Sequence, residues 1–309
     1  MKYCFGVDVG GTTIKLGLFT VEGELLDKWE IKTYAENEGE RILPDVSETI
    51  KVKIKERKIA TDDICGIGVG VPAPVDKNGA IERAANVGWQ AKNIKKELEE
   101  LTGFSCVIGN DANVAALGEM WKGAGEGEKD LIMVTLGTGV GGGIIIDGRA
   151  VGGAHGAGGE IGHMTVRTDE TEACGCGRKG CLEQYASATG LVRLAKRYFE
   201  NNAKESILQG KEITAKEIFD AAKAGDEAAL LITEEFGAYL GQALVNLAAT
   251  VDPAVFVIGG GVSKAGNSLL DIVKKYFYEH AFYGNQKTRI TLATLGNDAG
   301  IYGAAKQVL

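Results

Sequence analysis

Two copies of one short pattern constrain the fold of this chain most. Each copy is a buried strand, a glycine-rich turn and a returning strand. The first copy covers residues 2–19 and turns at Gly10-Gly11-Thr12-Thr13, and the second covers residues 131–146 and turns at Gly137-Thr138-Gly139. Such a repeat predicts two halves of related topology.

Strands alternate with helices along the rest of the chain, which predicts a mixed α/β protein. Ser187 and Thr214 stand at the starts of two expected helices as capping residues. No long polar linker separates the halves, so we expect two closely packed α/β domains around a cleft. The pattern predicts helices over 42–57, 94–101, 112–121, 191–199, 215–224, 226–250, from Ser263 and over 300–308, and strands over 64–71, 105–108, 254–258 and 289–295.

Composition excludes several functional classes. The 309 residues carry a formal net charge of −8, which argues against a broad nucleic-acid surface because such surfaces need excess Lys and Arg. No apolar stretch approaches the roughly 20 residues of a membrane span, and no signal peptide precedes the first strand. These features predict a cytoplasmic enzyme.

The first glycine turn has the chemistry of a phosphate site. Backbone amides at Gly10 and Gly11 can approach phosphate oxygens closely, the hydroxyls of Thr12 and Thr13 add donors, and Asp8 can position a hydrated Mg²⁺. The alternative is a β-hairpin turn beside an incidental acid. The second glycine turn favours the phosphate interpretation, because both copies then serve one nucleotide.

Asp111 is a candidate general base. It follows a predicted strand and Asn110, and it precedes a predicted helix, so it is expected at a helix N-terminus. One role is to cap that helix, which Asp often does. The other is to accept a proton from a sugar hydroxyl. Both roles remain open from the local sequence.

The cysteines fall into two groups. Cys4, Cys65 and Cys106 lie in or beside apolar runs and are expected as reduced thiols. Cys174, Cys176 and Cys181 lie in a Gly-rich loop, and with His163 they form a structural zinc set that leaves no open coordination position. A redox cysteine pair is the alternative, although such pairs are usually Cys-x-x-Cys.

The glycine turns, Asn110-Asp111 and Gly259-Gly260-Gly261 resemble the nucleotide-binding turns of actin-like sugar kinases. More specifically, Glu160-Ile161-Gly162-His163, followed by the run from Cys174 to Glu183, resembles the signature of the ROK family (repressors, open reading frames and kinases). The resemblance covers the whole chain, and Asn86-Val87-Gly88-Trp89 is most similar to bacterial glucokinases of the Gram-positive type.

The resemblance implies an actin-like ATPase (ribonuclease H-like) fold and transfer of the γ-phosphate of ATP to the 6-hydroxyl of glucose. It also implies a homodimer. The smaller domain would comprise residues 1–118 and 298–309, and the larger one residues 119–297. Asp111 would be the base, and the sugar would be bound by Asn86, Asn110, Asp111, Glu160, His163 and Glu183. ATP would be bound by Asp8, Gly10, Gly11, Thr12, Thr13, Lys15, Gly137, Thr138, Gly139, Gly259, Gly260 and Gly261, with Mg²⁺ as cofactor and Zn²⁺ in the loop.

Alternatives of other classes remain. One is a kinase for N-acetylmannosamine, mannose, allose or fructose, because the hydroxyl-binding residues are shared. A sugar-sensing repressor would resemble this chain with an added helix-turn-helix domain, for which the first strand at residue 2 leaves no room. Glu160 and Glu183 could also be solvated loop acids, and a pure zinc-binding scaffold would not need the phosphate turns.

Overall fold

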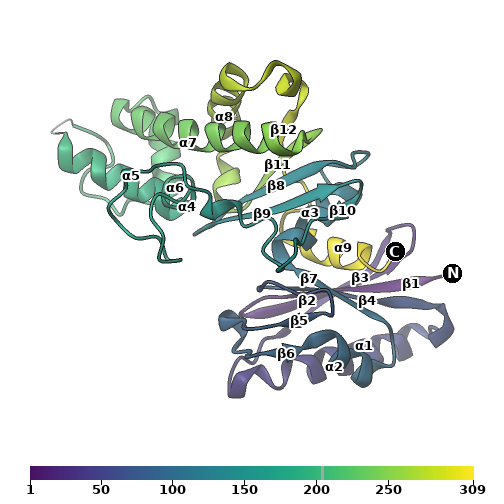
Figure 1. Ribbon diagram of the computed structural model, residues 1–309. Helices are drawn as coiled ribbons and strands as arrows, with labels where there is room; N and C mark the ends of the chain where they lie inside the picture. The colour runs from purple at the N-terminus through teal and green to yellow at the C-terminus, as the bar shows by residue number, and fades with distance from the viewer. Residues whose placement is uncertain (203–204) are drawn as a thin grey trace. The chain divides into compact units, whose positions relative to one another are not determined.

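The computed structural model describes residues 1–202 and 205–309 and combines sheets with helices (Figure 1). This part of the chain forms two compact units. Unit 1 consists of Met1–Lys129, Gly143–Gly159 and Thr294–Leu309, and unit 2 consists of Asp130–Gly142 and Glu160–Ala293. The domain limits near residues 118 and 297 stay a prediction.

The sheet of unit 1 has five strands in the order β3-β2-β1-β4-β7. β2 lies antiparallel to β1 and β3, whereas β4 lies parallel to β1 and β7. The strands are β1 (Tyr3–Val9), β2 (Thr13–Thr20), β3 (Leu25–Lys32), β4 (Ile64–Val71) and β7 (Cys106–Asn110), and a two-stranded ladder joins β5 (Ala80–Ile81) to β6 (Lys92–Asn93).

Helices cover both faces of this sheet, with α1 and α2 on one face and α3 and α9 on the other (Figure 1). Glycines allow α9 to pack closely. A Cβ at Gly68 would lie 1.7 Å from the Ala304 carbonyl oxygen, and one at Gly303 would lie 1.6 Å from the Val114 carbonyl oxygen. The four helices are α1 (Ile42–Arg57), α2 (Ile94–Thr102), α3 (Asp111–Lys122) and α9 (Ala299–Lys306).

The second sheet repeats this arrangement, with the order β10-β9-β8-β11-β12. β11 lies parallel to β8 and β12, as β4 lies parallel to β1 and β7. The matching strand order agrees with the repeat that the two glycine turns predict. The strands are β8 (Leu131–Leu136), β9 (Val140–Ile146), β10 (Arg149–Ala150), β11 (Val255–Gly259) and β12 (Arg289–Leu292).

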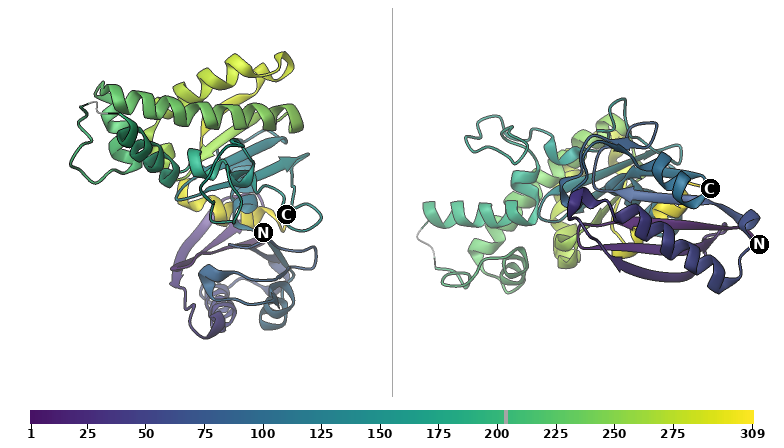
Figure 2. Two further views of the ribbon diagram at one scale, coloured as in Figure 1. Left: turned by 60° about the vertical axis from the view of Figure 1, so that its left-hand side comes forward. Right: turned by 90° about the horizontal axis from the view of Figure 1, so that it is seen from below.

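Unit 2 contains the long helix α7, with α8 beside it (Figure 2). Ser187, Thr214 and Asp226 cap α5, α6 and α7 by accepting hydrogen bonds from backbone N–H groups. None of the helices in residues 1–202 and 205–309 has the length and apolar composition needed to span a bilayer. The helices are α4 (Glu183–Ala186), α5 (Ala188–Asn201), α6 (Ala215–Lys223), α7 (Glu227–Val251) and α8 (Asn267–His280).

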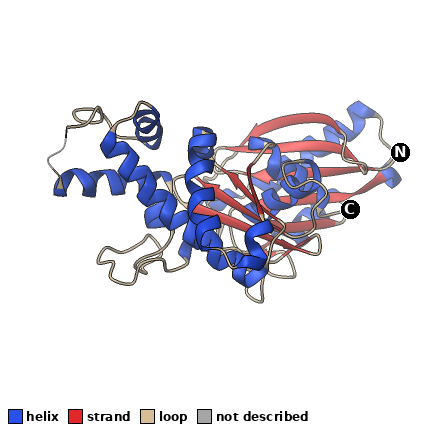
Figure 3. Cartoon of the chain, turned by 90° about the horizontal axis from the view of Figure 1, so that it is seen from above, coloured by secondary structure: helices blue, strands red, loops and turns tan. Residues whose placement is uncertain are grey.

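The predicted helices and strands are all present, with shifts at some ends (Figure 3). The helix expected from Ser263 begins at Asn267, because Gly266 has φ +68° and ends the short 3₁₀ helix η5 (Gly261–Ala265). The last strand ends at Leu292 rather than at residue 295. Strand β3 lacks a counterpart among the sequence-based predictions.

Candidate active site

The first glycine turn joins β1 to β2 in unit 1. The Gly10 N–H donates to the Thr13 carbonyl oxygen (3.1 Å), and the Thr33 hydroxyl donates to the Gly10 carbonyl oxygen (2.7 Å). Asp8 is half-buried and pairs across the hairpin with Lys15. Burial raises the pKa of Asp8, and the charge of Lys15 opposes that rise. A half-buried carboxylate beside a glycine turn suits a bound cation.

Asn86 lies against this turn. It is exposed in the 3₁₀ helix η3 (Ala85–Val87), and a Cβ at Gly11 would stand 3.0 Å from its carbonyl oxygen. The neighbouring Trp89 is fully buried, and its indole N–H donates to the Gly39 carbonyl oxygen (3.1 Å). The core therefore fixes the segment that presents Asn86 next to the turn.

Asn110, not Asp111, caps α3. The Asn110 side-chain oxygen accepts from the Ala112 N–H (3.0 Å) and the Asn113 N–H (3.3 Å). Asp111 is the first residue of the helix, and its Oδ1 accepts from the Ala112 N–H (2.8 Å). The N-cap role that the local sequence left open for Asp111 therefore belongs to Asn110.

The second glycine turn and Glu183 contact each other in unit 2. Glu183 Oε2 accepts from the Val140 N–H (3.1 Å), and a Cβ at Gly139 would lie 2.1 Å from that oxygen. The turn is also held by α5, because the Ala188 N–H donates to the Gly137 carbonyl oxygen (2.8 Å). A predicted phosphate turn and a predicted sugar carboxylate are therefore joined directly.

Gly259 ends β11, which pairs with β8, so the Gly259–Gly261 turn and the second glycine turn lie at the carboxyl ends of neighbouring parallel strands. Ligands commonly bind at such an edge in α/β sheets. Gly260 has φ +84° and ψ −178°, and a Cβ there would lie 2.5 Å from the Leu136 carbonyl oxygen. Only glycine adopts this conformation readily.

His163, Cys174, Cys176 and Cys181 form a cluster with the composition of a zinc site. Their ligand atoms all lie within 4.8 Å of one another. Cys176 Sγ and Cys181 Sγ are 3.7 Å apart, and His163 Nδ1 and Cys174 Sγ are 4.0 Å apart. Tetrahedral zinc with Zn–S bonds of about 2.3 Å separates two sulfurs by about 3.8 Å, so the four residues fit this metal.

The cluster is also linked to the predicted sugar residues. His163 ends the 3₁₀ helix η4 (Ile161–His163), and its N–H donates to the carbonyl oxygen of the exposed Glu160 (3.1 Å). Because Nδ1 of His163 faces Cys174, Nε2 is the ring nitrogen left for a second hydrogen bond. Cys174 Sγ also lies 3.7 Å from Glu183 Oε1.

Asn113 is a buried polar residue of α3 that the sequence analysis did not single out. Its side-chain N–H donates to the Gly158 carbonyl oxygen (3.2 Å), which ties α3 to the Gly-rich loop before Glu160. Asn113 is buried, with 5% of the residue exposed, and its Oδ1 has no hydrogen-bond partner among the described residues. In the sequence Asn113 is the second Asn of Asn-Asp-Ala-Asn. An Asn at this position, three residues after Asn110, is also typical of a buried contact in the core, so the pattern alone does not predict a role.

Comparisons with known proteins agree with these features. The ROK family model matches residues 4–309. The glucokinase of Halalkalibacterium halodurans is 42% identical over 308 residues, which cover 98% of this chain and 93% of that protein.

Solved structures agree as well. A ROK family glucokinase from Streptomyces griseus, in complex with glucose and AMPPNP, is 35% identical with TM-score 0.74, covering 99% of this chain and 98% of that one. The ROK hexokinase of Thermus thermophilus is 34% identical with TM-score 0.81, covering 98% and 96%. The predicted actin-like ATPase fold is confirmed by this likeness, and the chain belongs to the ROK family.

Proposed function

We propose that the protein is a glucokinase, which transfers the γ-phosphoryl group of ATP to the 6-hydroxyl of glucose and releases ADP and glucose 6-phosphate. The observation that carries the proposal is the position of Glu183. This carboxylate accepts from Val140 beside the second glycine turn and approaches Cys174 of the metal cluster. The chain is 35% identical to a ROK family glucokinase solved in complex with glucose, and this similarity supports glucose as the acceptor.

In the proposed reaction Asp111 orients the 6-hydroxyl and takes its proton. The oxygen attacks the γ-phosphorus, and the bond from that phosphorus to the β–γ bridging oxygen breaks, so ADP leaves with the bond electrons. Asn86, Asn110, Glu160, His163 and Glu183 hold the remaining hydroxyls. Amides, carboxylates and an imidazole suit a ring of alternating donors and acceptors.

The glycine turns hold ATP in this proposal. Backbone N–H groups of Gly10–Thr13 and Gly137–Gly139 donate to phosphate oxygens, with Lys15 as a nearby cation. Asp8 is the residue suited to hold Mg²⁺, which neutralises charge on the phosphates. In this proposal the adenosine occupies a cavity of about 190 Å³ that includes Gly261, and α6 and η5 line this cavity with Ala215, Lys216, Phe219, Val262 and Lys264.

Zinc has a structural role in the proposal, because four protein ligands fill its coordination sphere. The reaction consumes ATP and the site needs reduced thiols, and both conditions fit a cytoplasmic location. The homodimer stays a prediction.

The function is tested by ADP release from the purified, metal-loaded protein with ATP and Mg²⁺. The sugars are glucose, mannose, fructose, allose and N-acetylmannosamine, with a blank that contains no sugar. We expect the highest kcat/KM with glucose, and formation of glucose 6-phosphate in a coupled assay that reduces NADP⁺. 6-Deoxyglucose, which lacks the acceptor hydroxyl, should inhibit without reacting. Preference for another hexose would change the substrate, and no sugar-dependent turnover would overturn the kinase proposal in favour of sugar sensing.

Asp8→Asn should stabilise the ligand-free protein at pH 7 while lowering kcat/KM for MgATP. Burial raises the pKa of Asp8 above 3.8, so the folded state holds the proton more tightly than the unfolded chain. Stability therefore falls as pH rises from 3.8 through the folded pKa, and the cost is largest above that pKa. Scanning fluorimetry should show a higher Tm for Asp8→Asn at pH 7, and the difference should shrink as pH approaches 3.8.

The matched control is Asp62→Asn, because Asp62 is an exposed carboxylate of the same unit. Its Tm and its kcat/KM for MgATP should equal those of the wild type. A lower Tm for Asp8→Asn than for the wild type at pH 7 would contradict the prediction.

A further inference from the structure

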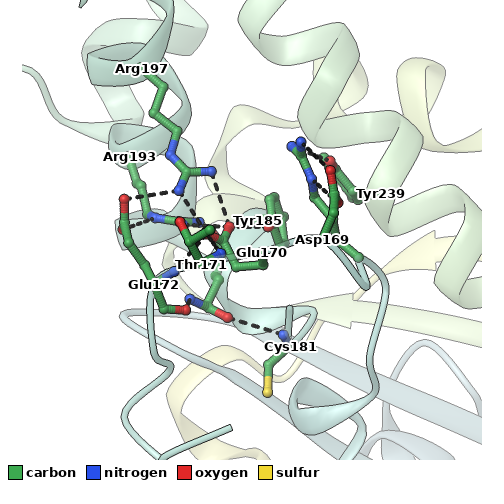
Figure 4. Close-up of polar contacts among 11 residues, drawn as sticks. Asp169, Glu170, Thr171, Glu172, Cys181, Tyr185, Arg193, Arg197 and Tyr239 are labelled. Atoms are coloured by element: carbon green, nitrogen blue, oxygen red, sulfur yellow. Dashed lines mark hydrogen bonds and ion pairs between the residues drawn. The ribbon is translucent and has the colours of Figure 1, made fainter. Parts of the chain in front are cut away.

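Unit 2 contains a buried carboxylate that the proposed reaction does not use. Glu170 lies between His163 and Cys174 in the sequence, and its side chain is 1% exposed. Figure 4 shows Glu170 with its polar partners. Two arginines of α5 bind it, Arg193 through Nη2 (2.6 Å) and Arg197 through Nη1 (3.0 Å) and Nη2 (2.9 Å). The remaining donors are the Thr171 N–H (2.8 Å), the Glu172 N–H (3.0 Å) and the Tyr185 hydroxyl.

These contacts keep Glu170 ionised. Hydrogen bonds from Arg197, with those from Tyr185 and Arg193, hold the pKa of Glu170 well below its ordinary value despite burial. A buried ion pair adds little net stability, yet removing one partner leaves an uncompensated buried charge. Such a pair therefore fixes geometry more than it stabilises the fold, and here it fixes the segment before Cys174 on α5.

The same network reaches the residues that follow Glu183. Tyr185 is fully buried, donates to Glu170 and stacks on Tyr239 of α7 with ring centroids 4.2 Å apart. Gln184 accepts from the Cys181 N–H (3.1 Å) and donates to the Glu172 carbonyl oxygen (3.1 Å). Its own carbonyl oxygen accepts from Arg193 Nη1 (3.2 Å).

α4 needs such support. It has four residues, too few to form a stable helix alone, so its position depends on tertiary contacts. Glu183 is its first residue and contacts both Val140 and Cys174. A shift of α4 would therefore move the Glu183 carboxylate relative to the second glycine turn.

We propose that Glu170 is a positioning residue: through Tyr185, and through Arg193 and its contact with Gln184, it holds α4, and with it Glu183, in place by contacts other than the metal–ligand bonds. Two sets of contacts then hold the same loop: the metal ligands at Cys174–Cys181 and the hydrogen bonds of the Glu170 carboxylate. The effect on sugar binding rests on the proposed function, because it requires that Glu183 bind the sugar.

The test is Glu170→Gln, which keeps the side-chain size and removes the charge. We expect the KM for glucose to rise roughly tenfold or more, since small displacements of binding groups have large kinetic effects. The KM for ATP and the zinc content should match the wild type. Glu172→Gln is the matched control, because Glu172 pairs with the same two arginines but its side chain is 60% exposed. Its KM values should stay within about twofold of the wild type.

Hydrogen exchange gives a readout that does not depend on catalysis. Peptides that cover residues 182–187 should exchange faster in Glu170→Gln than in the wild type or in Glu172→Gln. If the wild type phosphorylates no sugar, the proposed function fails, and the exchange result still decides whether Glu170 holds α4.

Tyr185→Phe removes one hydroxyl from the network while keeping the ring beside Tyr239. If Glu170→Gln does not fold, this variant decides: a higher KM for glucose with an unchanged KM for ATP supports the proposal. A lower Tm with an unchanged KM for glucose and unchanged exchange at α4 overturns it. Loss of zinc together with sugar binding also overturns it, because the effect would then pass through the metal.

Discussion

Asp111→Asn should lower kcat for glucose phosphorylation by about 10²–10⁴-fold while the protein stays folded. Asparagine is nearly the same size as aspartate but cannot accept the proton of the attacking hydroxyl. The helix start should survive, because Asn110 supplies the cap through Ala112 and Asn113. The loss should therefore fall on the chemical step and not on folding.

The measurement is steady-state kinetics with glucose and ATP, together with Tm and zinc content. The KM for ATP and the zinc content should match the wild type. Asp45→Asn is the control, because Asp45 is an acid in the first turn of another helix of the same unit. Its kcat should be unchanged. A kcat for Asp111→Asn within about tenfold of the wild type would remove Asp111 from the role of base.

Local patterns in the sequence predicted much of this structure. The caps at Ser187 and Thr214 depend on residues three positions apart, and the glycine turns depend on the few residues between two strands. The metal cluster follows from ligand spacing within one loop plus a single histidine. Such features are determined over short stretches of chain, so residue type and spacing are sufficient to predict them.

Features that depend on distant residues were missed. Arg193 and Arg197 lie one turn apart on α5, which is also the pattern of a solvated helix face, yet both bind the buried Glu170. Glu119 is fully buried in α3 and accepts from the N–H groups of Thr294 and Leu295. Both carboxylates also accept from nearby backbone N–H groups, but the partners that reveal their role come from distant parts of the chain, so residue spacing does not identify them.

The N-cap of α3 could not be assigned from the sequence for a different reason. Asn110 and Asp111 are adjacent, and both residue types are favoured at the N-cap position. A shift of one residue in the helix start exchanges their roles, and helix ends are the least certain part of a sequence-based prediction. The structure resolves the choice by placing Asn110 in extended conformation at the cap.

We expect loss of the zinc ion to lower the activity strongly, as we expect for loss of the base Asp111. Cys181→Ser should abolish stoichiometric zinc binding and lower kcat/KM for glucose by roughly 10²-fold or more, because loops of this kind depend on their metal for order. Cys181 is fully buried, and its Sγ lies 3.7 Å from Cys176 Sγ. The loop that carries it also leads into Glu183.

The same site predicts a pH dependence of metal release. Burial raises the pKa of the Cys181 thiol to about 12 in the metal-free protein and also raises the pKa of Cys174. Zinc must displace these protons, so protons compete with the metal and its affinity falls as pH decreases. A chelator should therefore remove zinc faster at pH 6 than at pH 8, and activity should fall in parallel.

Zinc content by elemental analysis, zinc release to a colorimetric chelator and glucose kinetics together test this role. Cys65→Ser is the matched control, because Cys65 is an exposed thiol outside the cluster. It should keep zinc and full activity. Adding Zn²⁺ to the stripped wild type should restore turnover, whereas Cys181→Ser should not recover. If the purified protein contains no zinc and its activity responds to thiol oxidants, the cluster is a redox site. If Cys181→Ser keeps full turnover, the activity does not depend on the metal.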